Sequence, residues 1–187
     1  MAFISNEEIC KMGFKKIGRN VKISSKASIY NIEKIEIGDN SRIDDFCILS
    51  GNISIGRNVH IAAFCNIAGG EQGVVLSDFS GLAYGCQIFS QSDDYSGKTL
   101  TNPTVPKKYK NEHFAAVTLE RHVIIGTNSV VLPGVTIAEG CSVGAMSMIT
   151  KSTTPWGIYF GIPAKRLKDR KKDLLGLEKQ YLQEEFK

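Results

Sequence analysis

The residues with the clearest chemical potential lie together in one polar segment. Asp93, Asp94 and Tyr95 open this segment, which runs to residue 116 and also contains His113. A carboxylate or an imidazole within reach of a substrate can accept a proton as a general base. The run Asp93-Asp94-Tyr95-Ser96-Gly97 could equally form a polar turn, since Asp, Ser and Gly are common turn residues. The segment is therefore either part of an active site, with a carboxylate or imidazole as the base, or only a polar turn.

Two basic clusters add a second kind of chemistry. They comprise Lys107, Lys108 and Lys110, and Lys165, Arg166, Lys168, Arg170, Lys171 and Lys172. Such clusters suit phosphate-bearing small molecules. They are too short, and too poor in interleaved aromatic residues, to indicate binding of nucleic acid. The second cluster could alternatively be the solvated face of a C-terminal helix.

The bulk properties are those of one globular domain. The 187 residues carry a net charge of only +4 and can bury a substantial core. No run of 18 apolar residues is present, so we expect no membrane span, and the acidic N-terminus is not typical of a signal peptide. Five cysteines without paired spacing argue against a disulfide framework or a metal site. We therefore expect a cytoplasmic protein without a metal.

A six-residue repeat must position these residues, because it occupies most of the chain. Eighteen hexads carry Ile, Leu or Val at their first place. These residues are Ile17, Ile23, Ile29, Ile37, Ile43, Leu49, Ile55, Ile61, Ile67, Leu76, Leu82, Ile88, Leu119, Ile125, Val131, Ile137, Val143 and Ile149. Neither the helical period of 3.6 nor the strand period of 2 produces a period of six. The repeat predicts an all-β solenoid of about six coils, each with three short strands.

The other places of the hexad describe the corners of the coil. The fifth place is Ala, Ser, Cys, Thr or Val in 15 of 18 hexads, with Glu33, Ile53 and Glu71 as exceptions. Four of the five cysteines occupy this place, namely Cys47, Cys65, Cys86 and Cys141, and we expect them to serve packing. The second place is often Gly, which would tolerate corner dihedral angles forbidden to other residues.

Three segments follow from this register. Residues 1–16 form an N-terminal helical cap, which Ser5 and Glu8 would start as a capping box. Residues 17–154 form the solenoid, with an extruded loop at 93–116, and a loop this long is usually functional. Residues 155–187 form an exit loop and a C-terminal helix. The apolar residues that predict this helix are Leu167, Leu174, Leu175, Tyr181, Leu182 and Phe186.

Four stretches of the C-terminal half carry a family resemblance. They are Ile124-Ile125-Gly126, residues 130–137 (VVLPGVTI), residues 143–151 (VGAMSMITK) and Gly161-Ile162-Pro163-Ala164-Lys165. With them the chain resembles the hexapeptide-repeat acyltransferases, and most of all the N-acetyltransferases of nucleotide-linked amino sugars such as dTDP-4-amino-4,6-dideoxyglucose. The resemblance implies a left-handed parallel β-helix.

The resemblance also implies a homotrimer with acetyl-CoA bound in the groove between neighbouring prisms. By motif position, the residues that would line the pantetheine arm are Thr127, Gly144, Ala145, Thr150 and Lys151, whereas Lys165 and Lys168 would meet the CoA phosphates. Corner geometry alone could also explain the small residues Gly144 and Ala145.

One departure from the family pattern bears on the substrate. Where this family usually places a histidine base, the present chain has Asp93. A sugar hydroxyl needs a base near neutrality, whereas a sizeable fraction of an amino group is already a neutral nucleophile. Asp93 or Asp94 could orient an amine and take its proton, and the adjacent carboxylate would raise the proton affinity. Tyr95 would then contact the substrate.

The three histidines fit less well as catalytic groups. His60 and His122 lie inside hexads and are expected to face outward, whereas His113 could approach the substrate. A carbonic anhydrase of the solenoid type needs three histidines around a metal, and the close-spaced pair of that family is absent.

The sequence therefore predicts an acyl-CoA-dependent N-acetyltransferase that acts on a nucleotide-linked amino sugar in surface polysaccharide or O-antigen biosynthesis. One alternative is an O-acetyltransferase of a galactoside, maltose or polysaccharide hydroxyl, with His113 as the base. The other is a non-enzymatic solenoid scaffold. Neither nucleic acid nor a membrane is expected as a partner.

Overall fold

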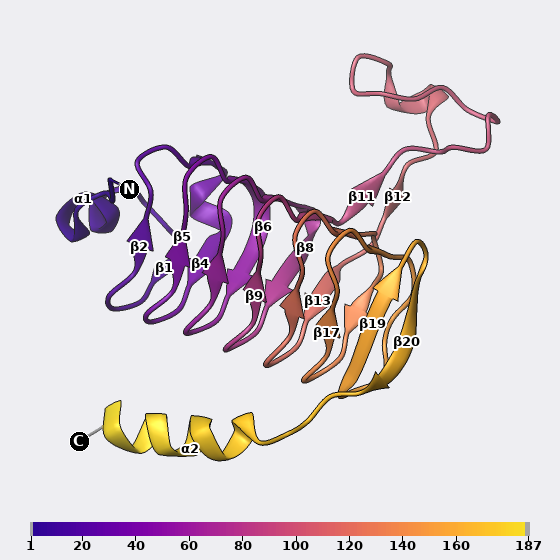
Figure 1. The fold of residues 1–187 in the computed structure, drawn as a ribbon. Helices are drawn as coiled ribbons and strands as arrows, with labels where there is room; N and C mark the ends of the chain where they lie inside the picture. Colours follow the sequence, from indigo (N-terminus) through magenta and orange to yellow (C-terminus); the bar gives the residue numbers. More distant parts are fainter. Residues whose placement is uncertain (1, 186–187) are drawn as a thin grey trace.

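The repeats wind into a three-sided parallel β-helix (Figure 1). The structure is a computed structural model and describes residues 2–185. One side of the prism stacks β2 (Lys22–Ile23), β5 (Arg42–Ile43), β7 (His60–Ile61), β9 (Gly81–Leu82), β14 (Ile124–Ile125), β17 (Ser142–Val143) and β19 (Gly157–Gly161). These seven levels exceed the expected six, because β19 adds a level beyond the last hexad. The winding is consistent with the left-handed β-helix that the resemblance implies.

The other two sides are joined, because β6 and β8 run around a corner without a break. The second side stacks β3 (Ser28–Tyr30), β6 (Ile48–Ile55), β8 (Asn66–Leu76), β10 (Gln87–Phe89), β15 (Val130–Val131) and β18 (Met148–Ile149). The third stacks β1 (Lys16–Ile17), β4 (Ile35–Ile37), the far halves of β6 and β8, β13 (Val117–Leu119) and β16 (Thr136–Ile137). A short 3₁₀ turn, η1 (Ile32–Lys34), lies at the same corner in the first coil.

First-place residues form the core, as the repeat predicts. All of them are buried except Ile17 and Ile29, which belong to the first coil and are half-buried. The cysteines at the fifth place are buried and free, which confirms the packing role. Their thiols also donate to a carbonyl of the next coil, for example from Cys65 Sγ to the Ala83 oxygen at 3.1 Å and from Cys86 Sγ to the Gly126 oxygen at 3.2 Å.

The reason for glycine at the second place differs from the expectation. Gly126 does not have a positive φ, but a Cβ there would lie 2.4 Å from the backbone nitrogen of Ala145 in the next coil. The positive φ falls instead at the fourth place. Residues with this conformation there are Asn20, Asn40, Phe46, Asn58, Phe64, Gly70, Phe79, Gly85, His122, Asn128, Gly134, Gly140 and Met146. The second place therefore needs glycine for close approach of two coils.

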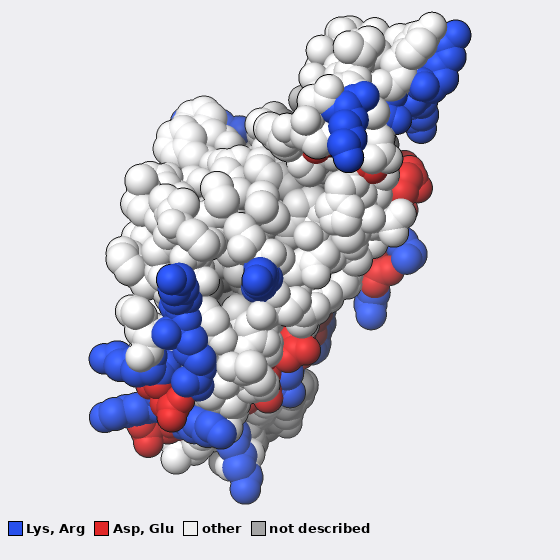
Figure 2. Space-filling view, turned by 90° about the vertical axis from the view of Figure 1, so that its right-hand side faces the viewer, with Lys and Arg blue, Asp and Glu red and all other residues white. Residues whose placement is uncertain are grey.

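The long loop leaves the prism as a hairpin. Strands β11 (Gln91–Ser92) and β12 (His113–Phe114) pair antiparallel, and the residues between them project from the body of the molecule (Figure 1, Figure 2). A 3₁₀ turn, η2 (Lys107–Tyr109), lies within the projecting part.

The two ends of the chain differ in how well they match the prediction. Helix α1 (Asn6–Lys11) has the predicted capping box between Ser5 and Glu8. The predicted exit loop is wrong, because residues 157–169 form a hairpin of β19 with the antiparallel β20 (Ala164–Asp169). Leu167 lies in β20 rather than in the C-terminal helix α2 (Leu174–Glu185), because the strand extends the sheet by one member. Phe186 lies outside the described residues.

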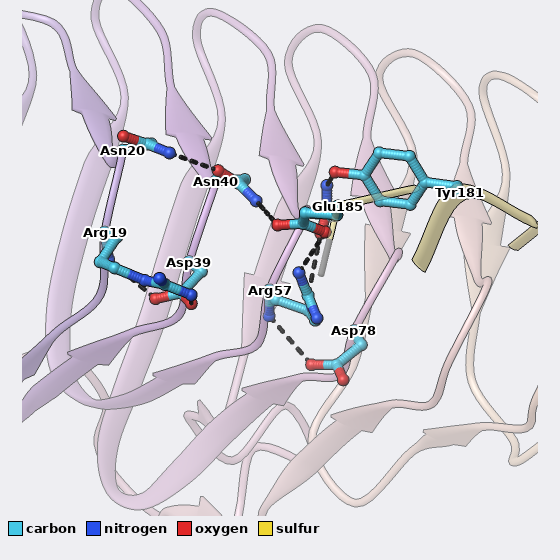
Figure 3. A network of polar contacts seen from close by, with 9 residues as sticks. Arg19, Asn20, Asp39, Asn40, Arg57, Asp78, Tyr181 and Glu185 are labelled. Carbon is cyan, nitrogen blue, oxygen red and sulfur yellow. Dashed lines mark hydrogen bonds and ion pairs between the residues drawn. The ribbon is translucent and has the colours of Figure 1, made fainter. Parts of the chain in front are cut away.

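Helix α2 runs back along one corner of the prism and contacts several coils by polar groups (Figure 3). Glu185 accepts hydrogen bonds from Asn40 at 2.6 Å and from Arg57 at 2.5 Å, and Asn58 donates to the Tyr181 hydroxyl at 3.0 Å. His122 pairs with Glu178 at 2.9 Å.

The outward orientation expected for His122 is therefore wrong. Only 6% of the residue is exposed, because the ring stacks on Phe79 with 5.4 Å between the ring centroids, beneath α2. His60 is exposed, as expected. Among the described residues, no helix is long and apolar enough to cross a membrane.

Replacing Gly126 by Ala should destabilise the fold by about 1–3 kcal/mol, because the new methyl group would overlap the backbone of the next coil. Urea unfolding followed by circular dichroism measures the change. Gly176→Ala is the matched control, since no atom lies within 4 Å of a Cβ at this position of α2, and it should stabilise the helix by about 0.5–1 kcal/mol. Equal effects of the two substitutions would contradict the close-approach explanation.

Candidate active site

The loop base and one side of the prism enclose a pocket. Its volume is about 690 Å³. Its lining consists of Phe89, Gln91, Ser92, Asp93, Tyr95, Pro103, Glu112, Val130, Leu132, Pro133 and Met148. The prism supplies an apolar wall from β15 and β18, and the loop supplies the polar groups. A small polar molecule with an apolar part fits such a site.

The structure separates the two adjacent aspartates. Asp94 accepts hydrogen bonds from the Ser96 backbone N–H at 2.8 Å, the Ser96 hydroxyl at 3.0 Å and the Thr99 hydroxyl at 2.9 Å. These bonds, first the one from the Ser96 backbone, lower the pKa of Asp94 and make it a poorer base than the sequence suggested. Asp94 therefore stabilises a turn, as expected if this segment were a polar turn.

Asp93 is the aspartate that lines the pocket. Its carboxylate accepts one hydrogen bond, from the Asn102 backbone N–H at 3.3 Å. That bond ties the start of the loop to its far half and leaves acceptor capacity for a ligand. Asp93 therefore has the position and the free lone pairs of a candidate base.

Of the other two predicted loop residues, Tyr95 lines the pocket and His113 does not. Tyr95 lines the pocket and is 91% exposed, so a bound ligand could cover it. His113 pairs with Ser92 across the hairpin and is exposed, but it is not among the residues that line the pocket. Sequence reasoning missed Gln91 and Glu112. The signal for Glu112 would have been the hairpin itself, because pairing of Ser92 with His113 puts residue 112 opposite residue 93.

A second pocket, of about 450 Å³, lies on the N-terminal side of the loop base. Lys34, Lys107 and Lys110 line it together with the closely approaching glycines Gly51 and Gly70. Lys34 pairs with Glu71 at 3.1 Å, and Lys110 pairs with Glu112 at 3.1 Å. Glu71 and Glu112 also line this pocket, so its three lysines leave a small positive charge that suits an anionic group. Gln91, Pro103 and Glu112 border both pockets.

The predicted CoA residues fall at two corners of the same prism side. Thr150 and Lys151 are exposed and follow β18, one coil beyond Leu132, whose N–H donates to the Ile149 oxygen at 3.1 Å. They therefore lie next to the pocket lining. Thr127, Gly144 and Ala145 lie at the opposite corner, where the Met146 N–H donates to the Thr127 oxygen at 2.8 Å.

Lys165 and Lys168 are exposed on β20. Figure 2 shows two separate groups of basic side chains on this end of the molecule, one on the projecting loop and one on the body below it. No predicted CoA residue of the described chain lines the loop pocket. Within residues 2–185, no group of three or more His, Cys, Asp or Glu side chains could hold a metal ion.

Known proteins share both the repeats and the overall sequence of this chain. The family described as "Bacterial transferase hexapeptide (six repeats)" matches residues 34–69 and 116–151. The chain is 42% identical over 184 residues to dTDP-4-amino-4,6-dideoxy-D-glucose acyltransferase of Escherichia coli, covering 97% of this chain and 95% of the relative.

Two solved structures of AntD, an N-acyltransferase from Bacillus cereus, superpose on nearly the whole chain. One holds dTDP and 3-hydroxybutyryl-CoA, with a TM-score of 0.97, 46% identity and coverage of 99% of this chain and 98% of AntD. The other is a variant with dTDP-4-amino-4,6-dideoxyglucose and coenzyme A, with a TM-score of 0.97, 48% identity and coverage of 98% of both chains. Identity at this level over almost the full length, together with the matched repeats, shows that the chain belongs to the hexapeptide-repeat acyltransferases.

Proposed function

We propose that this protein transfers an acyl group from acyl-CoA to the amino group of dTDP-4-amino-4,6-dideoxyglucose in surface polysaccharide or O-antigen biosynthesis. The observation that carries the proposal is Asp93, which presents a carboxylate to the loop pocket where the resemblance would place a histidine. The E. coli relative bears the name of this reaction, and AntD binds both this sugar nucleotide and CoA.

The proposed reaction is direct acyl transfer without an acyl-enzyme. The amine nitrogen attacks the thioester carbonyl, the carbon–sulfur bond of the adduct breaks, and the sulfur leaves as CoA thiol. The proton that the nitrogen loses balances the one that the sulfur gains. Asp93 orients the amine and accepts a proton from the nitrogen as the tetrahedral adduct forms. A carboxylate suffices for this role, because the neutral amine is already a nucleophile. Asp94 holds the turn that presents Asp93.

The second pocket suits the nucleotide part of the substrate. Lys107 and Lys110 enter it from the loop, and Lys34 enters it from η1. A diphosphate bound there would lie beside the loop pocket, because Gln91 and Glu112 border both cavities. Tyr95 and His113 would complete the surroundings of the sugar nucleotide.

A homotrimer explains why the expected CoA residues occupy two corners. We assign the pantetheine arm to Thr127, Gly144, Ala145, Thr150 and Lys151, and the CoA phosphates to Lys165 and Lys168. In one chain the first three lie across a prism side from Asp93, so a neighbouring prism would have to bring the two halves together.

An exposed apolar stripe along the Thr127 corner supports this assembly. Its residues are Phe46 (50% exposed), Phe64 (60%), Tyr84 (59%), Met146 (59%) and Ile162 (69%). Phe46 and Phe64 stack with 5.2 Å between their ring centroids, which makes the stripe continuous over two coils. A row of exposed apolar side chains of this kind is typical of a protein–protein interface. The free thiols throughout the described chain fit a reducing compartment such as the cytoplasm.

The proposal is tested by the release of CoA thiol from acetyl-CoA and 3-hydroxybutyryl-CoA with a panel of acceptors. Turnover is expected with dTDP-4-amino-4,6-dideoxyglucose. Other members of the panel are dTDP-3-amino sugars, UDP-amino sugars and plain galactosides. Turnover confined to the galactosides would overturn the N-acyltransferase assignment in favour of O-acylation.

Asp93→Asn should lower kcat by about 10²–10⁴-fold, because an amide cannot accept the proton. Asp94→Asn should lower kcat by less than about tenfold, since the amide oxygen can still accept from the Ser96 N–H. Steady-state kinetics with the amino sugar measure both, and His113→Asn serves as the control that tests the alternative base. A larger loss for His113→Asn than for Asp93→Asn would show that the base has been misassigned.

Light scattering should give a particle of three times the 20.5 kDa chain mass. Phe64→Arg should shift it toward the monomer, because a charge within an apolar interface is costly to desolvate. Leu177→Arg on α2 is the matched control, since Leu177 is similarly exposed at 65% but lies outside the stripe. A monomeric wild-type protein, or dissociation by Leu177→Arg alone, would refute the proposed interface.

A further inference from the structure

A partly buried ion pair lies at the border between the two pockets. Lys110 Nζ lies 3.1 Å from Glu112 Oε1, and the side chains are only 6% and 24% exposed. Glu112 is one of three residues that line both cavities. A carboxylate this deep in a loop is costly unless its partners are well placed, and Lys110 supplies one of them.

Glu112 also stands opposite Asp93. The antiparallel hairpin pairs Gln91 with Phe114 and Ser92 with His113, and the next position of this register is Asp93 with Glu112. Asp93 and Glu112 thus flank the last pair of the hairpin, one on each arm. Both residues line the loop pocket, so two carboxylates approach it from the two arms of the hairpin.

Lys110 pairs with Glu112 from the neighbouring cavity, and no basic side chain of the described residues lines the loop pocket itself. The remaining polar groups there come from Gln91, Ser92 and Tyr95, which are neutral side chains. Because Lys110 offsets only one of the two carboxylates and itself lines the other cavity, the lining of the loop pocket keeps a negative charge. Such a pocket favours a cationic ammonium group over an uncharged hydroxyl group, because charge-assisted hydrogen bonds are about twice as strong as neutral ones.

We propose that Glu112 is a specificity-determining residue that binds the ammonium group of the acceptor and so selects amino sugars over their hydroxyl counterparts. This inference rests on the proposed function. Lys110 fixes the Glu112 carboxylate from the nucleotide side. The bound ammonium group releases one proton to solvent to become the neutral amine that attacks, and Asp93, on the other arm of the hairpin, accepts the second proton as the adduct forms. One carboxylate thus holds the amino group while the other accepts its proton.

Glu112→Gln tests the assignment, because it keeps the shape of the side chain and removes its charge. The variant should raise KM for dTDP-4-amino-4,6-dideoxyglucose about tenfold to hundredfold, in line with the loss of one charged hydrogen bond. KM for acyl-CoA should stay within about twofold. The inhibition constant of dTDP-6-deoxyglucose, which carries a hydroxyl at the same carbon, should also stay within about twofold.

Lys110→Met is the matched control for a purely structural ion pair. It leaves the Glu112 charge in the pocket, so the preference for the amino sugar over its hydroxyl analogue should persist. If Glu112→Gln weakens both ligands equally, or if both variants lose the preference alike, Glu112 is not the specificity determinant. A wild-type enzyme that acylates no amino sugar would overturn the proposed function itself, whereas an active wild type matched by Glu112→Gln would overturn only this inference.

Discussion

The close stacking of successive coils is the constraint on which the rest of this structure depends. Parallel strands lie about 4.8 Å apart, so each corner of one coil rests directly on the same corner of the next. At Gly126 even one methyl group would meet the backbone of Ala145. At the fifth place, thiols and hydroxyls are small enough to fit and can donate to a carbonyl above, as Cys65 does to Ala83. Corner residues are therefore selected for size first and for hydrogen bonding second.

The same constraint explains where function can reside. A corner that must stack on its neighbours cannot carry a large binding surface, so the chain leaves the stack at β11 and returns at β12. The excursion carries Asp93, Tyr95 and Glu112 to a rigid prism side, which contributes Val130 and Met148. The polar groups of the pocket are positioned by the short hairpin base, where two strands and the Asp94 turn hold the chain.

Much of the fold follows from the sequence, because one aliphatic residue in every six reports directly on the buried side of the coil. The site is less accessible to such reasoning. Adjacent aspartates look alike in sequence, and only the Ser96 and Thr99 hydrogen bonds show which of them folds the turn. Glu112 lines the pocket only because the hairpin brings it near Asp93, and the hairpin is not visible in the sequence. His122 was expected to face solvent, but helix α2, which is remote in sequence, covers it. Among the exceptions at the fifth place, Ile53 is buried, because β6 rounds its corner as a continuous strand.

Helix α2 changes what kind of folding unit the prism is. In an open solenoid each coil contacts only its neighbours, so the array can fray from either end in small steps. Here the last segment of the chain reaches back to Asn40, Asn58 and His122, which belong to three different coils. The chain is closed upon itself by contacts of very long sequence separation, including the ion pair of Arg57 with Glu185. Such closure couples the early coils to the late ones, so that opening one end costs contacts at the other and unfolding gains cooperativity.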